Sequence, residues 1–82
     1  MKWQHSNRSK DDYNSLQQKI QKAFDKQVRL LAENLLHPSL RAKKFDEAED
    51  LWQARVTKAW RFYFKIDDYT YIITRIVPHP KK

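Results

Sequence analysis

The sequence predicts an α+β domain in which an N-terminal helical hairpin, or one kinked helix, packs on a small, twisted antiparallel β-meander. Two periodicities predict this fold. Apolar residues first recur every three or four positions, which is the period of an amphipathic helix. After residue 50 they alternate with polar residues, as in half-buried strands. The 82 residues are enough for one domain, which we expect to span 1–82.

The helical layer is predicted to run from Ser9 to Leu36. Two capping-box patterns, Ser9 with Asp12 and Ser15 with Gln18, mark two helix starts. They favour a hairpin, and a single kinked helix is the alternative. The apolar stripe that faces the sheet consists of Leu16, Ile20, Phe24, Val28, Leu31 and Leu35.

A polar loop is predicted to follow over residues 39–50, because the residue before Pro38 is pushed out of the α region. A short extended piece is expected within the loop at 42–45. Pro78 and Pro80 end the last strand, since proline cannot donate to a ladder. The predicted strands are 52–56, 60–66 and 69–77, with tight turns at 57–59 and 67–68.

The two faces of this predicted sheet differ in chemistry. The helices are expected to cover the face that carries Trp60, Phe62, Phe64 and Ile66. The opposite face presents Arg55, Arg61, Tyr63 and Lys65, and Arg75 fits the same face by strand parity. Guanidinium groups bind phosphate through a planar fork, and a tyrosine can stack on a base. This face therefore predicts a phosphate site, with an ordinary solvated sheet face as the alternative.

The composition supports a polyanionic partner and excludes several other classes. Seventeen Lys and Arg oppose ten Asp and Glu, so the formal charge of +7 attracts nucleic acid or an acidic protein. Without cysteine there is no disulfide and no thiolate, which suits a reducing cytosol. Glycine is absent, which excludes Gly-rich phosphate loops. No apolar run is long enough for a bilayer, so we expect a cytoplasmic protein with no membrane partner.

A basic loop and a C-terminal histidine complete the candidate site. Arg41, Lys43 and Lys44 form a basic run before the sheet, which widens the cationic patch or is merely solvated. His79 follows the strand of Arg75, and its imidazole can transfer protons near neutrality. A histidine between two prolines can equally be a plain loop residue.

Other chemistries find no support in the sequence. His5 and His37 have no metal-like spacing to another ligand, so we expect no metal and no small-molecule cofactor. No serine stands in a nucleophile setting with a histidine and a carboxylate.

Four segments together resemble the RelE/ParE toxin superfamily. They are His37–Phe45 (HPSLRAKKF), Leu51–Val56 (LWQARV), Trp60–Phe64 (WRFYF) and Tyr71–Ile73 (YII). Each segment by itself is a loose match, but their order and spacing together are fairly specific. The resemblance as a whole extends over residues 16–79. Gln53 stands where the family commonly has Glu, and Pro78 stands where Gly is usual.

The resemblance implies the RelE-like fold, with a reduced first strand at Lys2–His5. It also implies the toxin of a toxin–antitoxin pair. Arg61 matches the catalytic arginine and Arg55 a second arginine of the family pattern. Lys43 and Lys44 lie where basic residues flank the scissile phosphate, and His79 lies near the C-terminal basic position. The general base is left open among Lys43, Lys44 and His79.

RelE-like members cut mRNA in the ribosomal A site, whereas ParE-like members poison DNA gyrase. The resemblance therefore implies cleavage by 2′-hydroxyl transesterification, with the ribosome, mRNA and an acidic, partly disordered antitoxin as partners. The alternatives are a gyrase inhibitor and a non-catalytic basic module that binds RNA or antitoxin.

Overall fold

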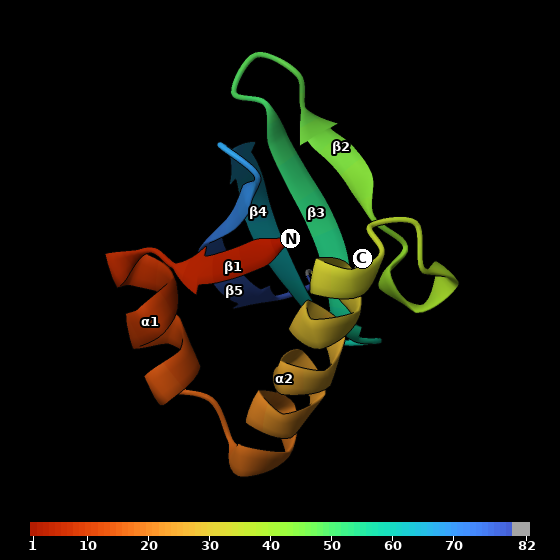
Figure 1. Ribbon diagram of the computed structural model, residues 1–82. Coiled ribbons are helices and arrows are strands. Elements are labelled where there is room, and N and C mark those ends of the chain that lie inside the picture. The colour runs from red at the N-terminus through yellow and green to blue at the C-terminus, as the bar shows by residue number, and fades with distance from the viewer. Residues whose placement is uncertain (80–82) are drawn as a thin grey trace.

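A computed structural model describes residues 1–79 as two helices and a five-stranded sheet (Figure 1). The elements, in chain order, are β1 (Lys2–His5), α1 (Asn7–Asn14), α2 (Gln18–Glu33), a short 3-10 helix (Pro38–Leu40), β2 (Lys43–Asp46), β3 (Leu51–Thr57), β4 (Trp60–Asp67) and β5 (Thr70–Pro78). The α+β class and the three predicted C-terminal strands are confirmed. The expectation that Pro80 helps to end β5 concerns a residue outside the described part of the chain.

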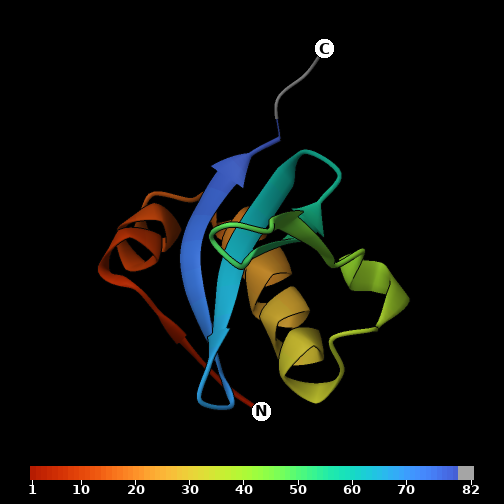
Figure 2. The ribbon, with the colours of Figure 1, turned by 90° about the horizontal axis from the view of Figure 1, so that it is seen from above.

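The sheet has the strand order β1-β5-β4-β3-β2. Strands β2 to β5 form the antiparallel meander predicted from the alternation, and β2 occupies the extended piece expected in the loop. Strand β1 joins the far edge parallel to β5, so the complete sheet is mixed. Helix α1 packs on β5 and α2 packs on β3 (Figures 1 and 2).

The helical layer is a hairpin, as predicted, but both expected caps are wrong. The cap of α1 is Ser6, whose Oγ accepts a hydrogen bond from the Ser9 backbone N–H at 3.1 Å. Ser9 itself is fully buried, and its hydroxyl lies 2.7 Å from Nδ1 of His5. Ser15 lies at the end of α1 and donates its hydroxyl to the carbonyl of Asp11. Both serines therefore bond to residues three or four positions earlier in the chain, and neither caps a helix N-terminus.

The core forms where α2 meets the central strands. Phe24 has no exposed surface, and its ring lies 5.4 Å from that of Phe62. Phe64 is also fully buried, as the predicted strand face requires. Trp60 is only partly buried and Ile66 keeps 37% of its surface exposed. These two residues lie towards the ends of β4, where less of the helical layer covers the sheet.

An extra residue in β5 changes its side-chain alternation. Tyr63 pairs with Arg75 but Phe64 pairs with Ile73, so Thr74 is inserted as a β-bulge. As a result Tyr71, Ile73 and Ile76 are all buried, although strict alternation would put Ile76 on the opposite face.

Asp12 satisfies the part of the β5 edge that β1 does not reach. Its carboxylate accepts hydrogen bonds from Arg75 Nε at 2.8 Å, from Arg75 Nη2 at 3.3 Å and from the Ile76 backbone N–H at 3.0 Å. Burial by itself raises the pKa of Asp12. The bonds from Arg75 and Ile76, with the charges of Arg75 and Arg8, outweigh burial and hold that pKa below its ordinary value.

Turns without glycine use other residues at positive φ. The β4–β5 turn was predicted at Asp67–Asp68, but its tip is Asp68–Tyr69, with φ of 49° and 60°. Asp67 instead pairs with Thr70 inside the ladder. Two successive residues at positive φ match the twist of the flanking strands, which explains the shift by one residue.

In residues 1–79 no helix combines the length and the apolar character needed to cross a membrane.

Replacement of Asp12 by asparagine is expected to lower the free energy of unfolding at pH 7 by roughly 1–3 kcal/mol, because two charge-assisted bonds lose their acceptor charge. Since the folded-state pKa of Asp12 is lowered, its contribution is complete above the unfolded-state pKa. It disappears as pH falls through the folded-state value. Urea unfolding should therefore show a gap between wild type and Asp12→Asn that closes below about pH 4.

The matched control is Asp11→Asn, which changes an exposed carboxylate one position earlier. An equal loss of stability in both variants would contradict the assignment to Asp12.

Candidate functional site

A cationic concavity lies on the sheet surface away from the core. It has a volume of 240 Å³, and no carboxylate is among the residues that line it. Four of the lining residues carry a positive charge and a fifth is a histidine, so the concavity attracts anions. The lining residues are Arg41, Lys43, Gln53, Ala54, Arg55, Arg61 and His79. Lys43, Gln53, Arg55 and Arg61, with Tyr63, define what we call the open face.

Three adjacent strands position the centre of the concavity. Arg55 on β3 pairs directly with Arg61 on β4, and Lys43 on β2 pairs with Gln53 on β3. Paired residues project from the same side of a sheet, so these four side chains share one surface. The juxtaposition follows from the register of the meander.

Two residues outside the ladder close the concavity. Arg41 follows the 3-10 helix in a left-handed conformation with φ of 46°. His79 is held at the other side, because its backbone N–H donates to the carbonyl of Ala59 at 2.7 Å. That bond docks the end of β5 onto the β3–β4 turn.

The guanidinium of Arg61 organises the β3–β4 turn. Its Nη1 lies within hydrogen-bond distance of three carbonyl oxygens, of Thr57 at 2.6 Å, Trp60 at 2.9 Å and Lys58 at 3.2 Å. Burial and the positive charges of Arg55 and Arg41 lower the pKa of Arg61, although Tyr63 opposes them. An anion in the concavity would relieve this crowding of like charges.

Arg55, like Arg61, has a feature that indicates an anion site. Its Nε is buried and has no hydrogen-bond partner within the described residues. The backbone of Arg55 is held from the helical side of the sheet, since the amide of the buried Gln27 in α2 donates a hydrogen bond to the Arg55 carbonyl at 2.9 Å. Buried donors are rarely left unpaired, and phosphate oxygens are natural acceptors for a guanidinium.

Other predicted site residues lie outside the concavity. Tyr63 stands beside it, with its hydroxyl accepting a bond from the amide of Gln53 at 3.0 Å. Lys65 lies two residues further along β4, exposed to solvent.

Two predicted site residues are placed elsewhere, which corrects the predicted grouping. Alternation along β2 puts Lys43 on the open face, and Lys44 projects the other way. There its ammonium pairs with Asp50 and lies 5.2 Å from the centre of the Trp52 ring. The hydrogen bond that Lys44 donates to Asp50 raises the pKa of Lys44, which opposes a role as general base. Arg75 pairs with Tyr63 in the β4–β5 ladder, but its guanidinium is bound by Asp12 of α1 and does not line the concavity.

Sequence reasoning missed two residues of this region. Strand alternation puts Gln53 on the same face as Arg55 but does not predict a role for it, yet Gln53 lines the concavity and orients Tyr63. Phe45 is not among the predicted site residues, yet 55% of its surface is exposed and the centre of its ring lies 5.0 Å from that of Tyr63. Alternation from Lys43 would have placed Phe45 on the open face once β2 was known to pair.

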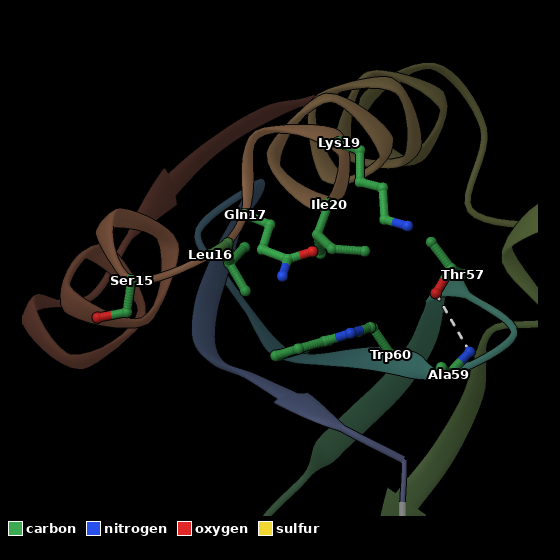
Figure 3. A pocket seen from close by; sticks show the side chains of 8 residues that line it. All are labelled: Ser15, Leu16, Gln17, Lys19, Ile20, Thr57, Ala59 and Trp60. Carbon is green, nitrogen blue, oxygen red and sulfur yellow. Dashed lines mark hydrogen bonds between the residues drawn. The ribbon is translucent and has the colours of Figure 1, made fainter.

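A second, apolar concavity of 640 Å³ lies between the start of α2 and the β3–β4 turn (Figure 3). In Figure 3, the Trp60 side chain lies across from Ile20 and Gln17, and the Thr57 hydroxyl accepts a bond from the Ala59 N–H at 3.1 Å. The only charged residue among those that line it is Lys19. This surface suits an apolar side chain of a partner rather than a phosphodiester.

No group of three or more potential metal ligands occurs among residues 1–79.

No protein-family model matches the sequence, and no curated protein matches it. Solved structures match it closely in fold. The YoeB/ParE toxin from Agrobacterium tumefaciens superposes with a TM-score of 0.81 at 15% identity, covering 98% of this chain and 100% of that one. The YoeB dimer from Staphylococcus aureus gives 0.80 at 19%, covering 98% of each chain. RelE in the archaeal RelE–RelB complex from Pyrococcus horikoshii gives 0.80 at 16%, covering 99% and 97%.

These matches confirm the predicted RelE-like fold. At such identities they concern the fold alone.

Inorganic phosphate is expected to stabilise the protein by binding in the cationic concavity. A ligand at 100 times its dissociation constant adds about 2.7 kcal/mol. The melting temperature should therefore rise in phosphate relative to sodium chloride of equal ionic strength, and Arg55→Met should abolish the difference. Lys26→Met, which removes one exposed charge from α2, should retain it. A phosphate effect that persists in Arg55→Met would place the anion elsewhere.

Proposed function

We propose that this protein is the toxin of a toxin–antitoxin pair and that it cleaves mRNA on the ribosome. The RelE-like fold is shared with toxins, and the observation that carries the proposal is the cationic concavity. There Arg55 and Arg61 face the same space without a carboxylate in the lining. Such a site fits a phosphodiester better than an uncharged substrate.

The proposed reaction is an internal transesterification. A base removes the proton of a ribose 2′-hydroxyl, and that oxygen attacks the adjacent phosphorus in line. The bond from phosphorus to the 5′-oxygen breaks, and the 5′-oxygen takes a proton from water. The products are a 2′,3′-cyclic phosphate and a 5′-hydroxyl. Arg55 and Arg61 would stabilise the negative charge that develops on the phosphoryl oxygens. Arg41 and Lys43 would hold the neighbouring backbone.

His79 and Lys43 are the candidate general bases. Both line the concavity. His79 is favoured because an imidazole transfers protons readily near neutrality. Lys44 is no longer a candidate, because it pairs with Asp50 away from the open face.

We also propose an antitoxin as the protein partner. The Pyrococcus horikoshii structure is a RelE–RelB complex, and this chain carries a net charge of +7, which an acidic chain would complement. The apolar concavity is the proposed dock for an apolar side chain of the antitoxin. Lys19 at its rim would pair with a carboxylate of the same segment.

Arg61→Ala is expected to reduce cleavage of ribosome-bound mRNA by roughly 100-fold or more, the usual cost of removing a transition-state donor. Primer extension on programmed ribosomes would measure the cuts, and growth arrest on induction would report activity in cells. Because Arg61 also holds the β3–β4 turn, circular dichroism must show that the variant folds. Arg55→Ala provides a second test, and Lys65→Ala is the control on the same strand as Arg61.

Cleavage that is unchanged in both Arg61→Ala and Arg55→Ala would reject the mechanism. A supercoiling assay distinguishes this proposal from the ParE-like alternative. If the protein inhibits gyrase and does not cut mRNA, the gyrase-inhibitor alternative is correct and this proposal is rejected.

Lys19→Glu is expected to weaken neutralisation by the antitoxin, because it places a negative charge where an acidic segment docks. Co-expression with an antitoxin that neutralises the wild-type protein should then rescue growth less well than it does for wild type. Lys10→Glu makes the same exposed charge reversal on α1 and should leave rescue intact. Equal rescue in both variants would exclude the apolar concavity as the dock.

A further inference from the structure

An exposed aromatic side chain borders the cationic concavity. Phe45 keeps 55% of its surface exposed, whereas most large apolar residues in the described part of the chain are buried or half-buried. It sits at an irregularity of β2, where Lys44 pairs with Trp52 and Asp46 pairs with Leu51, so Phe45 has no residue opposite it. Because Phe45 lies two residues after Lys43 on β2, its side chain projects from the open face.

Tyr63 supports Phe45 from the neighbouring part of the sheet. The two rings meet edge to face, with centroids 5.0 Å apart and planes at 67°. Tyr63 is fixed in turn, since Gln53 donates a hydrogen bond to its hydroxyl at 3.0 Å. We call Phe45 and Tyr63 the aromatic ridge. Gln53 also lines the concavity, so one side chain connects the two features.

The pairing of a fixed aromatic surface with a cluster of cations suits a nucleotide. Every base has a π-face that stacks on an aromatic ring, while its phosphate binds cations. Lys43 projects from the same edge strand two residues before Phe45 and lines the concavity. An apolar protein segment would use the ridge without needing the arginines beside it. Glu47 and Asp50 of the adjacent turn pair with Lys44, so their charges are partly neutralised.

We propose that the aromatic ridge is a base-stacking subsite, in which Phe45 binds the nucleobase next to the phosphate held by Arg55 and Arg61. This inference rests on the proposed function, because it requires single-stranded RNA on the open face. It deepens that function by assigning Phe45 as a positioning residue. Tyr63 acts through Phe45 by fixing the orientation of its ring.

The test uses a short single-stranded RNA with 2-aminopurine at one position and a second RNA of equal charge that is abasic there. Wild type should quench the 2-aminopurine fluorescence and bind the base-containing RNA more tightly than the abasic one. A single stacked base corresponds to roughly a 5- to 150-fold difference in affinity. Phe45→Leu should bind both RNAs equally and lose the quenching, while Phe45→Trp should restore both effects.

Tyr69→Leu is the matched control, because Tyr69 is 81% exposed at the tip of the β4–β5 turn. It should behave as wild type. Thermal unfolding of each variant reports whether the fold is intact, and loss of quenching in a folded Phe45→Leu is the decisive result.

The outcomes separate this inference from the proposed function. If Phe45→Leu quenches and discriminates as wild type does, the subsite is refuted, while mRNA cleavage by wild type leaves the function intact. If wild type neither binds the RNAs nor cuts mRNA, both proposals fail. If Phe45→Leu changes only neutralisation by the antitoxin, the ridge is a protein contact and the base subsite is refuted.

Discussion

The packing of Phe24 against Phe62 determines how the rest of the molecule is divided. It holds α2 on one face of the sheet, so the apolar residues of β3, β4 and β5 are buried on that side. The charged residues of the same strands must then project from the other side, because side chains alternate along a strand. The cationic concavity is thus a direct consequence of covering one face of a small sheet. No separate structural unit is needed to build it.

The clustered cations of the concavity lower the stability of the folded protein, but they favour binding of the proposed ligand. Arg41, Arg55 and Arg61 repel one another, and one buried donor of Arg55 has no partner within the described chain. Bonds from the surrounding structure offset part of this cost. Arg61 is held by the carbonyls of the β3–β4 turn, and Gln27 fixes the strand behind Arg55. Strain of this kind is typical of binding sites, where a ligand supplies the missing interactions.

The sequence predicted those parts of the fold that depend on local pattern. The helical stripe through Phe24 and the alternation through Phe62 and Phe64 predicted the two layers. Alternation also predicted that Arg55 and Arg61 share one face, and the structure pairs them directly. The sequence did not predict the features that depend on tertiary contacts. Neither the ion pair with Asp12, which takes the guanidinium of Arg75, nor the role of Ser6 as a cap leaves a periodic signal in the sequence. Strand alternation therefore predicted that Arg55 and Arg61 lie together, but it could not predict that Lys44 and Arg75 are bound to carboxylates outside the concavity.

The two outermost strands, β1 and β2, have four residues each, and β2 is further interrupted by its irregularity at Phe45. Short, bulged and lysine-bearing borders are poor templates for backbone pairing with another chain. A partner therefore cannot readily recognise this protein by adding a strand to its sheet. Recognition must instead depend on side chains, through the shape and charge of the open face and of the helical layer. The same property protects a strongly positive, sheet-rich protein from self-association into fibres.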